Sequence, residues 1–192
     1  MAPVNVGYDS TNYYVIGKKT KLLIDVGWPG TLPKLLAVLK RKDIAFPAIG
    51  YLLCTHYHPD HAGLAQEMKA NGARLIVTDE QVAAIPVLKT YMKPANQYVD
   101  ITLHDNVRVS CAESRAFLAK LGIDGEIIPT PGHSDDSVSL VLDDGSAFTG
   151  DLTSPALLDD VIGETVMRSW GAIRALGAAV IYPGHGPERV LR

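Results

Sequence analysis

Residues 55–61 read Thr-His-Tyr-His-Pro-Asp-His, and this stretch holds three of the six histidines in the 192-residue chain. It follows an apolar run over residues 49–55, which predicts a buried strand. His56 and His58 are two positions apart, so an extended backbone places both imidazoles on one side of the segment. Because neutral imidazole is a common metal ligand, the pair is predicted to share an ion.

The same stretch changes direction after its second histidine. Pro59 interrupts the extended backbone, and Asp60 and His61 stand where the chain turns into a predicted helix. Their side chains therefore leave in a different direction from the first two imidazoles. This change of direction indicates a second metal site next to the first.

Three later segments share one design, in which a predicted strand ends in a tight turn that presents a ligand-type residue. A glycine precedes that residue each time and allows the backbone conformations that other residues resist. Side chains at strand ends are well placed to point into a shared cleft. The segments are Pro129-Thr130-Pro131-Gly132-His133, Ala147-Phe148-Thr149-Gly150-Asp151 and Ile181-Tyr182-Pro183-Gly184-His185.

Strand and helix patterns alternate along the chain, with hairpins expected at Lys18 and at Asp144-Gly145. This alternation predicts an α/β fold of mixed sheets covered by helices, and residues 1–192 are expected to form a single domain. Thr31 and Asp60 are the expected helix caps. Strands are predicted over residues 12–17, 21–26, 49–55, 74–78, 107–111, 125–129, 138–142, 147–149 and 179–182, and helices over 31–41, 60–70, 79–87, 114–121 and 165–176.

Composition narrows the expected partners. Eighteen basic and 21 acidic residues give a formal net charge of -3, without the basic excess of a nucleic-acid-binding protein. Residues 124–160 contain nine acidic residues and no Lys or Arg, which disfavours polyanionic substrates. We find no apolar stretch of about 18 residues and no cationic amino-terminal leader, so neither a membrane partner nor export is expected. A cytoplasmic protein acting on a small-molecule substrate is expected, with its oligomeric state left open.

The sequence resembles the metallo-β-lactamase superfamily of metallohydrolases. The resemblance rests on five motifs in the family's order, which are LIDVG with Asp25, THYHPDH, TPGHS, FTGD and YPGHG. It implies a four-layer αββα sandwich, with two mixed β-sheets flanked by helices and the metals in a cleft at one edge. It also implies that the first metal is held by His56, His58 and His133, the second by Asp60, His61 and His185, with Asp151 bridging both and Asp25 supporting them from behind.

The donor set indicates the chemistry. Five imidazoles and two carboxylates without a thiolate suit two zinc ions per chain, although iron or manganese would also fit. The resemblance implies a hydrolase in which a metal-bridging hydroxide attacks an ester, thioester, lactone or amide carbonyl, and Asp60 is expected to orient that hydroxide. Trp28, in the loop after Asp25, is predicted to form part of the substrate wall; packing on helix 31–41 is the alternative.

Branches of the superfamily differ in features that this sequence can be tested for. Seven residues follow His185, too few for the glutathione-binding helical extension of glyoxalase II, so a small glyoxalase II-like thioesterase stays open. Acyl homoserine lactonases carry a tyrosine three residues after the bridging aspartate, whereas this chain has Ser154 there, which weakens the lactonase-like reading. Hydrolysis of β-lactams and a mononuclear iron centre resembling the persulfide dioxygenases remain the alternatives. Asp135 and Asp136 receive no role, and His104 is expected to be a surface residue.

Overall fold

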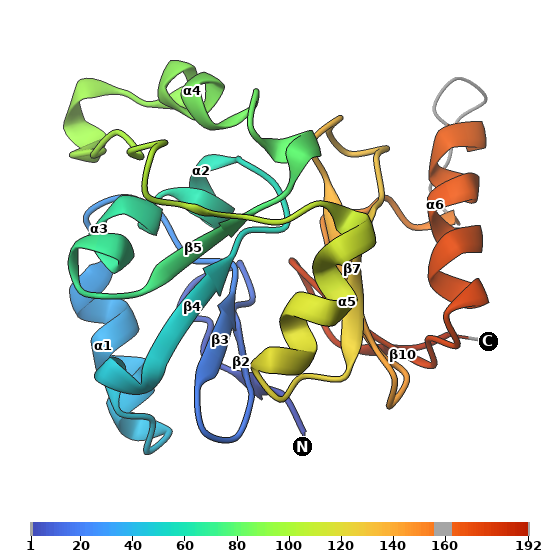
Figure 1. Ribbon diagram of the computed structural model, residues 1–192. Helices are drawn as coiled ribbons and strands as arrows, with labels where there is room; N and C mark the ends of the chain where they lie inside the picture. The colour runs from blue at the N-terminus through green and yellow to red at the C-terminus, as the bar shows by residue number, and fades with distance from the viewer. Residues whose placement is uncertain (1, 156–162, 192) are drawn as a thin grey trace.

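Two β-sheets lie face to face in the computed structural model, which describes residues 2–155 and 163–191 (Figure 1). The first sheet has the strand order β1-β2-β3-β4-β5-β6, and the second has the order β11-β10-β9-β8-β7. Both are mixed, with parallel pairing along β3 to β6 and between β9 and β10. The strands are β1 (Val4–Asn5), β2 (Tyr14–Ile16), β3 (Lys21–Ile24), β4 (Ile49–Leu53), β5 (Arg74–Val77), β6 (Val107–Arg108), β7 (Gly125–Pro129), β8 (Val138–Leu142), β9 (Ser146–Gly150), β10 (Val180–Pro183) and β11 (Arg189–Val190).

Helices cover the outer faces of the two sheets. In Figure 1, α1 and α3 lie at the left, on the outer face of the first sheet, and α6 lies at the right, on the outer face of the second sheet. None of the helices within the described ranges is long and apolar enough to cross a membrane. The helices are α1 (Leu32–Arg41), α2 (Pro59–Ala62), α3 (Ala65–Ala70), α4 (Ile85–Leu88), α5 (Cys111–Lys120) and α6 (Gly163–Ala175).

Alternation along the strands builds three separate cores. In β3, Leu23 packs in the core under α1 and α3, whereas Leu22 and Ile24 face the second sheet. In β8, Leu140 lies between the sheets, whereas Val141 packs against α6. Successive residues of a strand point to opposite faces, so each sheet buries both of its faces. The predicted α/β class and the αββα layering are confirmed.

The predicted helix over residues 60–70 is wrong in its details. The chain forms two short helices, α2 and α3, which are interrupted at Gly63 and Leu64. Glycine favours helix poorly, and the loop after β3 packs closely here, since a Cβ at position 63 would collide with Pro29 and lie 2.7 Å from the Gly27 carbonyl oxygen. Asp60 does not cap a helix, because His58 occupies the N-cap position and Asp60 lies in the first turn of α2.

Three other expectations about local structure need correction. The predicted strand over residues 107–111 ends at Arg108, because the Ser110 hydroxyl caps α5 by accepting from the Glu113 amide. The predicted helix over residues 79–87 is a 3-10 turn at Asp79–Gln81 followed by α4. Thr31 occupies the N-cap of α1, but its hydroxyl donates to the Trp28 carbonyl instead of capping the helix.

The predicted ligand positions all lie at one edge of the two sheets. Strands β7, β9 and β10 run in the same direction, so the segments that follow them leave at the same edge. The segment after β4 joins this edge, since the Val138 amide donates to the Thr55 carbonyl at 2.8 Å. The architecture therefore gathers four segments that are distant in sequence.

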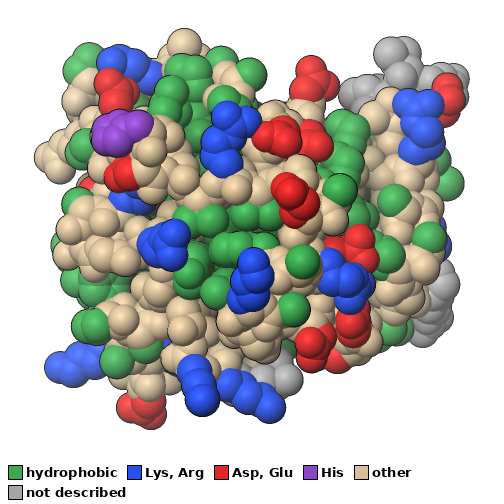
Figure 2. All heavy atoms as spheres, in the orientation of Figure 1, with side chains coloured by type: hydrophobic (Ala, Val, Ile, Leu, Met, Phe, Trp, Pro, Cys, Tyr) green, Lys and Arg blue, Asp and Glu red, His purple; other side chains and the backbone are tan. Residues whose placement is uncertain are grey.

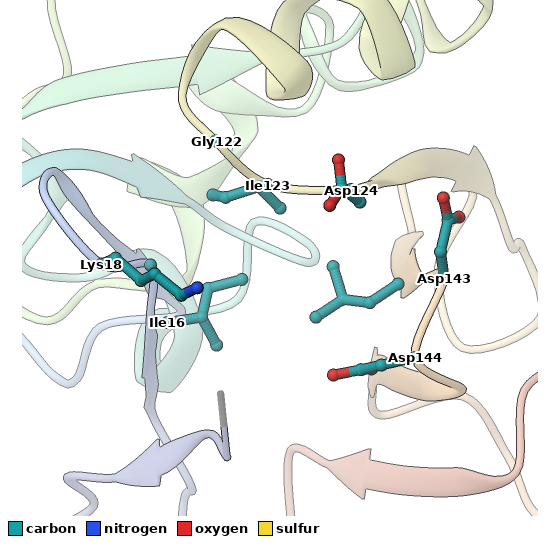
Figure 3. A pocket seen from close by; sticks show the side chains of 9 residues that line it. Ile16, Lys18, Gly122, Ile123, Asp124, Asp143 and Asp144 are labelled. Atoms are coloured by element: carbon teal, nitrogen blue, oxygen red, sulfur yellow. The ribbon is translucent and has the colours of Figure 1, made fainter.

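The opposite edge carries a cavity of about 330 Å³ (Figure 3). Ile16 and Ile123 line it together with the β8–β9 turn, and Lys18, Asp124 and Asp143 stand around it. On the face shown in Figure 2, acidic side chains gather over α5 and β7. Of the acidic run predicted to repel polyanions, Asp159 and Asp160 lie outside the described residues.

Candidate metal centre

Seven side chains that could bind a metal converge at the shared sheet edge. They are the residues singled out by the sequence, and they fall into three groups whose donor atoms lie within 4.8 Å of one another. The groups are His56, His58 and His133; His56, His61 and Asp151; and Asp60, His61 and His185.

The first group is a triangle of imidazole nitrogens. His58 Nδ1 lies 3.1 Å from His56 Nε2 and 3.0 Å from His133 Nε2. Tetrahedral ligands about 2.0–2.1 Å from a zinc ion stand about 3.3 Å apart, so this spacing suits one shared ion. His56 also contacts Thr55 Oγ1 through Nδ1 at 3.2 Å, which leaves Nε2 facing the triangle. The structure brings the first two histidines together as predicted, although residues 55, 56 and 58 are bends and the segment after β4 is not an extended strand.

The group of Asp60, His61 and His185 combines two imidazoles with a carboxylate. Asp60 Oδ2 lies 3.2 Å from His185 Nε2 and 3.5 Å from His61 Nε2. Because Asp60 and His61 occupy the first turn of α2, their side chains leave the loop in a direction different from that of His58. The change of direction at Pro59 therefore separates the two groups as the sequence indicated.

Asp151 stands between the groups. Its Oδ1 lies 3.3 Å from His61 Nε2, and its Oδ2 lies 3.4 Å from His185 Nε2 and 3.7 Å from His133 Nε2. Both His61 Nε2 and Asp151 Oδ1 are buried without a hydrogen-bond partner. Buried polar atoms are rarely left unsatisfied, and one cation between these two would satisfy both. The residues present therefore fit a metal centre.

Asp25 holds the centre from behind. Its Oδ2 lies 2.9 Å from His61 Nδ1 and accepts from the Thr55 hydroxyl at 2.9 Å, while Oδ1 accepts from the Thr55 amide at 2.6 Å. Its φ of 60° lies in the left-handed region, which aspartate tolerates better than most residues. An acceptor at Nδ1 fixes the tautomer and leaves His61 Nε2 free to bind a metal.

Burial and neighbouring charges set the protonation of the site. Burial lowers the pKa of His56 well below its usual range, and the surrounding imidazoles lower it further. Burial also lowers the pKa of His61, but the carboxylates of Asp25 and Asp151 outweigh it and raise that pKa to about 10. His61 contributes charge balance to Asp151, whose pKa lies below its usual range even though burial raises it.

The amino-terminal segment braces the centre, which the sequence did not indicate. The buried Thr11 hydroxyl donates to Asp60 Oδ2 at 2.9 Å, and His185 Nδ1 lies 2.9 Å from the Ser10 carbonyl oxygen. The Asn12 amide donates to the Gly184 carbonyl at 2.7 Å. The contacting residues are up to 175 positions apart in the sequence, so no local motif predicts these hydrogen bonds.

Asp136 also has a defined place. Its Oδ2 accepts from the Tyr57 amide at 2.7 Å, so it holds the backbone between His56 and His58. Sequence reasoning named Asp136 without a role. The position of Asp136 three residues after His133 is the one signal that the sequence offers. Its partner Tyr57 lies after another strand, β4, so the sequence does not reveal the contact.

Two glycines allow the close approach that the centre needs. A Cβ at position 184 would lie 2.6 Å from His61 Cε1 and would collide with Asp151 Oδ1. Gly150 has a φ of 51°, and a Cβ there would collide with the Thr55 hydroxyl. Glycine before a ligand-type residue is thus required here by space at 184 and by space and backbone conformation at 150.

Two cavities flank the centre. One, of about 570 Å³, is lined by His58 and His133 together with α4 and the turns around it. The other, of about 420 Å³, is lined by His133, Asp151 and His185. Trp28 is not among the described residues that line either cavity. It is 40% exposed, in a loop joined to α2 by the hydrogen bond from the Val26 amide to the His61 carbonyl. His104 is exposed and outside all three groups.

Curated relatives share this chain's sequence over most of its length. A beta-lactamase-like protein 2 homolog from Caenorhabditis elegans is 29% identical over 92% of this chain and 56% of its own length. The thioesterase pkgB of Emericella nidulans is 28% identical over 96% of this chain and 48% of its own length. The chain therefore spans about half the length of these relatives.

Solved structures and a family model agree on the fold. A metallo-beta-lactamase family protein from Thermus thermophilus superposes with a TM-score of 0.72 at 23% identity, covering 98% of this chain and 73% of the other. The model of the metallo-beta-lactamase superfamily matches residues 6–185, which include every residue of the three groups. The chain belongs to the metallo-beta-lactamase superfamily.

Proposed function

We propose that the chain is a dinuclear metal-dependent hydrolase that cleaves the carbonyl of a small-molecule ester, thioester, lactone or amide, with a thioester as the first candidate. The observation that carries the proposal is the orphaned pair His61 Nε2 and Asp151 Oδ1. This pair lies between the groups of His58 and His185, so an ion on either side would share Asp151. Two zinc ions are the proposed cofactors, with iron or manganese as the other metals that suit these donors.

Each residue has a proposed task. Two bound ions would supply a hydroxide nucleophile near neutral pH and polarise the carbonyl oxygen. Asp151 offsets positive charge between the groups, and Asp25 faces His61 Nδ1, so that a bound ion would take the place of the proton on Nε2. Asp60 orients the attacking oxygen and is itself fixed by Thr11. For a thioester, a C–O bond forms, the C–S bond breaks, and the thiol leaves with one proton while the acid keeps the oxygen of water.

A thioester is favoured by the relatives. A protein that aligns with 96% of this chain is named a thioesterase, and no serine or cysteine nucleophile is required by the proposed chemistry. Cys54 is unsuited to that role, because burial raises the pKa of its thiol well above the usual range. The small-molecule substrate and the cytoplasmic location remain part of the proposal.

The test is hydrolysis by metal-loaded and chelator-treated protein, assayed against matched thioesters, esters, lactones and β-lactams. We expect thioester hydrolysis that chelation abolishes and zinc restores. Activity unaffected by complete metal removal, or none on any carbonyl substrate, would contradict the proposal.

Thr11→Val is expected to lower kcat about tenfold, because it removes the hydroxyl that fixes Asp60, and loss of such a supporting hydrogen bond costs about 10- to 100-fold. Thr11→Ser keeps the hydroxyl and should retain most of the activity. Weaker zinc binding in the valine variant, measured by competition with a chromophoric chelator, provides a second readout. Equal kinetics and metal affinity in the two variants would show that the hydroxyl does not position Asp60.

Trp28 is not among the described residues that line the two cavities, so its place in the substrate wall stays a prediction that rests on the contact of its loop with α2. Trp28→Ala should raise KM for bulky apolar substrates more than for small ones, with little change in Tm. A fall in Tm with equal effects on all substrates would instead place the indole against α1.

A further inference from the structure

We propose that the cavity beside His58 and His133 receives the acyl chain of the substrate. It favours hydrocarbon chains whose far end is neutral or positively charged over chains whose far end is an anion. The inference rests on the proposed function, because it places a substrate at the metal centre. It concerns a cavity of about 570 Å³, and its walls come from three parts of the chain.

One wall is apolar and unusually exposed. Ala84, Val87 and Tyr91 line the cavity from α4 and the turn after it. Val87 is 45% exposed and Tyr91 is 51% exposed, although both are large and apolar. The Tyr91 ring stands edge-on to the His58 ring, with centroids 5.4 Å apart. An apolar surface that continues up to a proposed metal ligand suits a hydrocarbon chain attached to the reacting carbonyl.

The other walls carry negative charge. Glu80, Asp135 and Asp136 line the cavity, and no Lys or Arg is among its described lining residues. Asp136 accepts from the Tyr57 amide and Glu80 accepts from the Cys111 thiol at 3.4 Å, and the side chains of Glu80 and Asp135 are exposed. A carboxylate at the far end of an acyl chain would meet like charges here, and an ammonium would meet opposite ones.

The second cavity suits the other half of the substrate. Arg189 lines it, together with Thr153 and Ser154, next to Asp151 and His185. A guanidinium and two hydroxyls are suited to a polar or anionic leaving group. The two cavities meet at His133, so a scissile carbonyl at the metal centre would place its two substituents in different surroundings.

The experiment uses three thioesters of N-acetylcysteamine with acyl chains of equal length, ending in a methyl, a carboxylate or an ammonium group. With metal-loaded protein, kcat/KM is expected to be about tenfold lower for the carboxylate than for the methyl compound, and equal or higher for the ammonium compound. Added salt should narrow the difference. The matching thioethers cannot be hydrolysed, so calorimetry measures their affinities without turnover. We expect the carboxylate compound to bind more weakly than the methyl and ammonium compounds.

Charge reversal locates the effect. Glu80→Lys and Asp135→Lys should each shift the carboxylate-to-ammonium preference several-fold towards the carboxylate, both in kcat/KM and in thioether binding. Val87→Asp should lower kcat/KM for the methyl thioester, and the affinity for the methyl thioether, several-fold. Val99→Asp is the matched control, since Val99 is 48% exposed and does not line the cavity, and it should behave as the original protein.

Two results would overturn the inference. One is equal binding of the three thioethers, and the other is a charge preference that neither lysine variant shifts. Failure of the proposed function is a separate outcome: no thioester would be hydrolysed by metal-loaded protein, while thioether binding would still report on the cavity.

Discussion

Replacing Asp151 with alanine is expected to lower hydrolysis about a thousandfold and to lower metal content. Asp151 places one oxygen near His61 and the other near His133 and His185, so it lies between the group that contains His58 and the group that contains His185. Metal-ion stabilisation of a transition state supplies several kcal/mol, and about 4 kcal/mol corresponds to three orders of magnitude in rate. Steady-state kinetics and elemental analysis of the same sample measure both effects.

The control for this substitution is His104→Ala, because His104 is exposed and outside the three groups. It should leave rate and metal content unchanged. Asp151→Ala with full metal content would show that the carboxylate does not bridge two ions, even if the rate falls.

Gly184→Ala is expected to reduce zinc affinity at least tenfold while the fold is retained. The added methyl group would lie 2.6 Å from His61 Cε1 and would collide with Asp151, so the two donors must separate. The expected loss follows from the sensitivity of metal sites to ligand orientation, about 10- to 100-fold for a displaced support. Chelator competition measures the affinity, and far-ultraviolet circular dichroism reports on the fold.

Gly171→Ala is the matched control, since position 171 lies in α6 and a Cβ there meets nothing within 4 Å. Alanine favours helix over glycine by about 1 kcal/mol, so Tm should stay constant or rise. Unchanged zinc affinity in Gly184→Ala would show that the site does not need the close approach of the turn after β10 to His61 and Asp151.

Local patterns in the sequence predicted most of what positions the site. Strands β7 and β8 have the predicted bounds, because each is a short, largely apolar run between turn signals, which determine where the strand begins and ends. The sequence points to every residue of the three groups, since His56, His58, Asp60 and His61 lie within six residues and the others follow glycine turns at strand ends. The structure brings these residues together, and their role as ligands stays a prediction.

Tertiary contacts account for what the sequence could not predict. The break between α2 and α3 falls at Gly63 and Leu64, where the loop after β3 packs so closely that a Cβ at position 63 would collide with Pro29, and a helical pattern over residues 60–70 does not contain this contact. The braces at Thr11 and Asp136 act on residues 49 and 79 positions away, and single threonines or aspartates carry no signal of such partners. At Ser110, by contrast, the sequence does contain a local signal, because Ser110 and Glu113 form the Ser-x-x-Glu capping pattern that marks the start of α5.

The two sheets explain why such distant residues can form one rigid site. Each ligand-type residue follows a strand whose side chains are buried on both faces, so its position is coupled to the cores rather than to a free loop. The hydrogen bond from Val138 to Thr55 and the contact of Gly150 with Thr55 join the two sheets directly behind the site. Preorganisation of this kind lowers the cost of ordering ligands when metal binds.

The central claim is that this centre holds two metal ions that serve hydrolysis. Elemental analysis of protein purified without chelator, combined with an assay of the same sample for thioester hydrolysis and oxygen uptake, tests it most directly. We predict two divalent ions per chain, with zinc foremost, hydrolysis that follows metal content, and no oxygen consumption. A single tightly bound iron per chain, with oxygen consumed and no thioester cleaved, would contradict the claim.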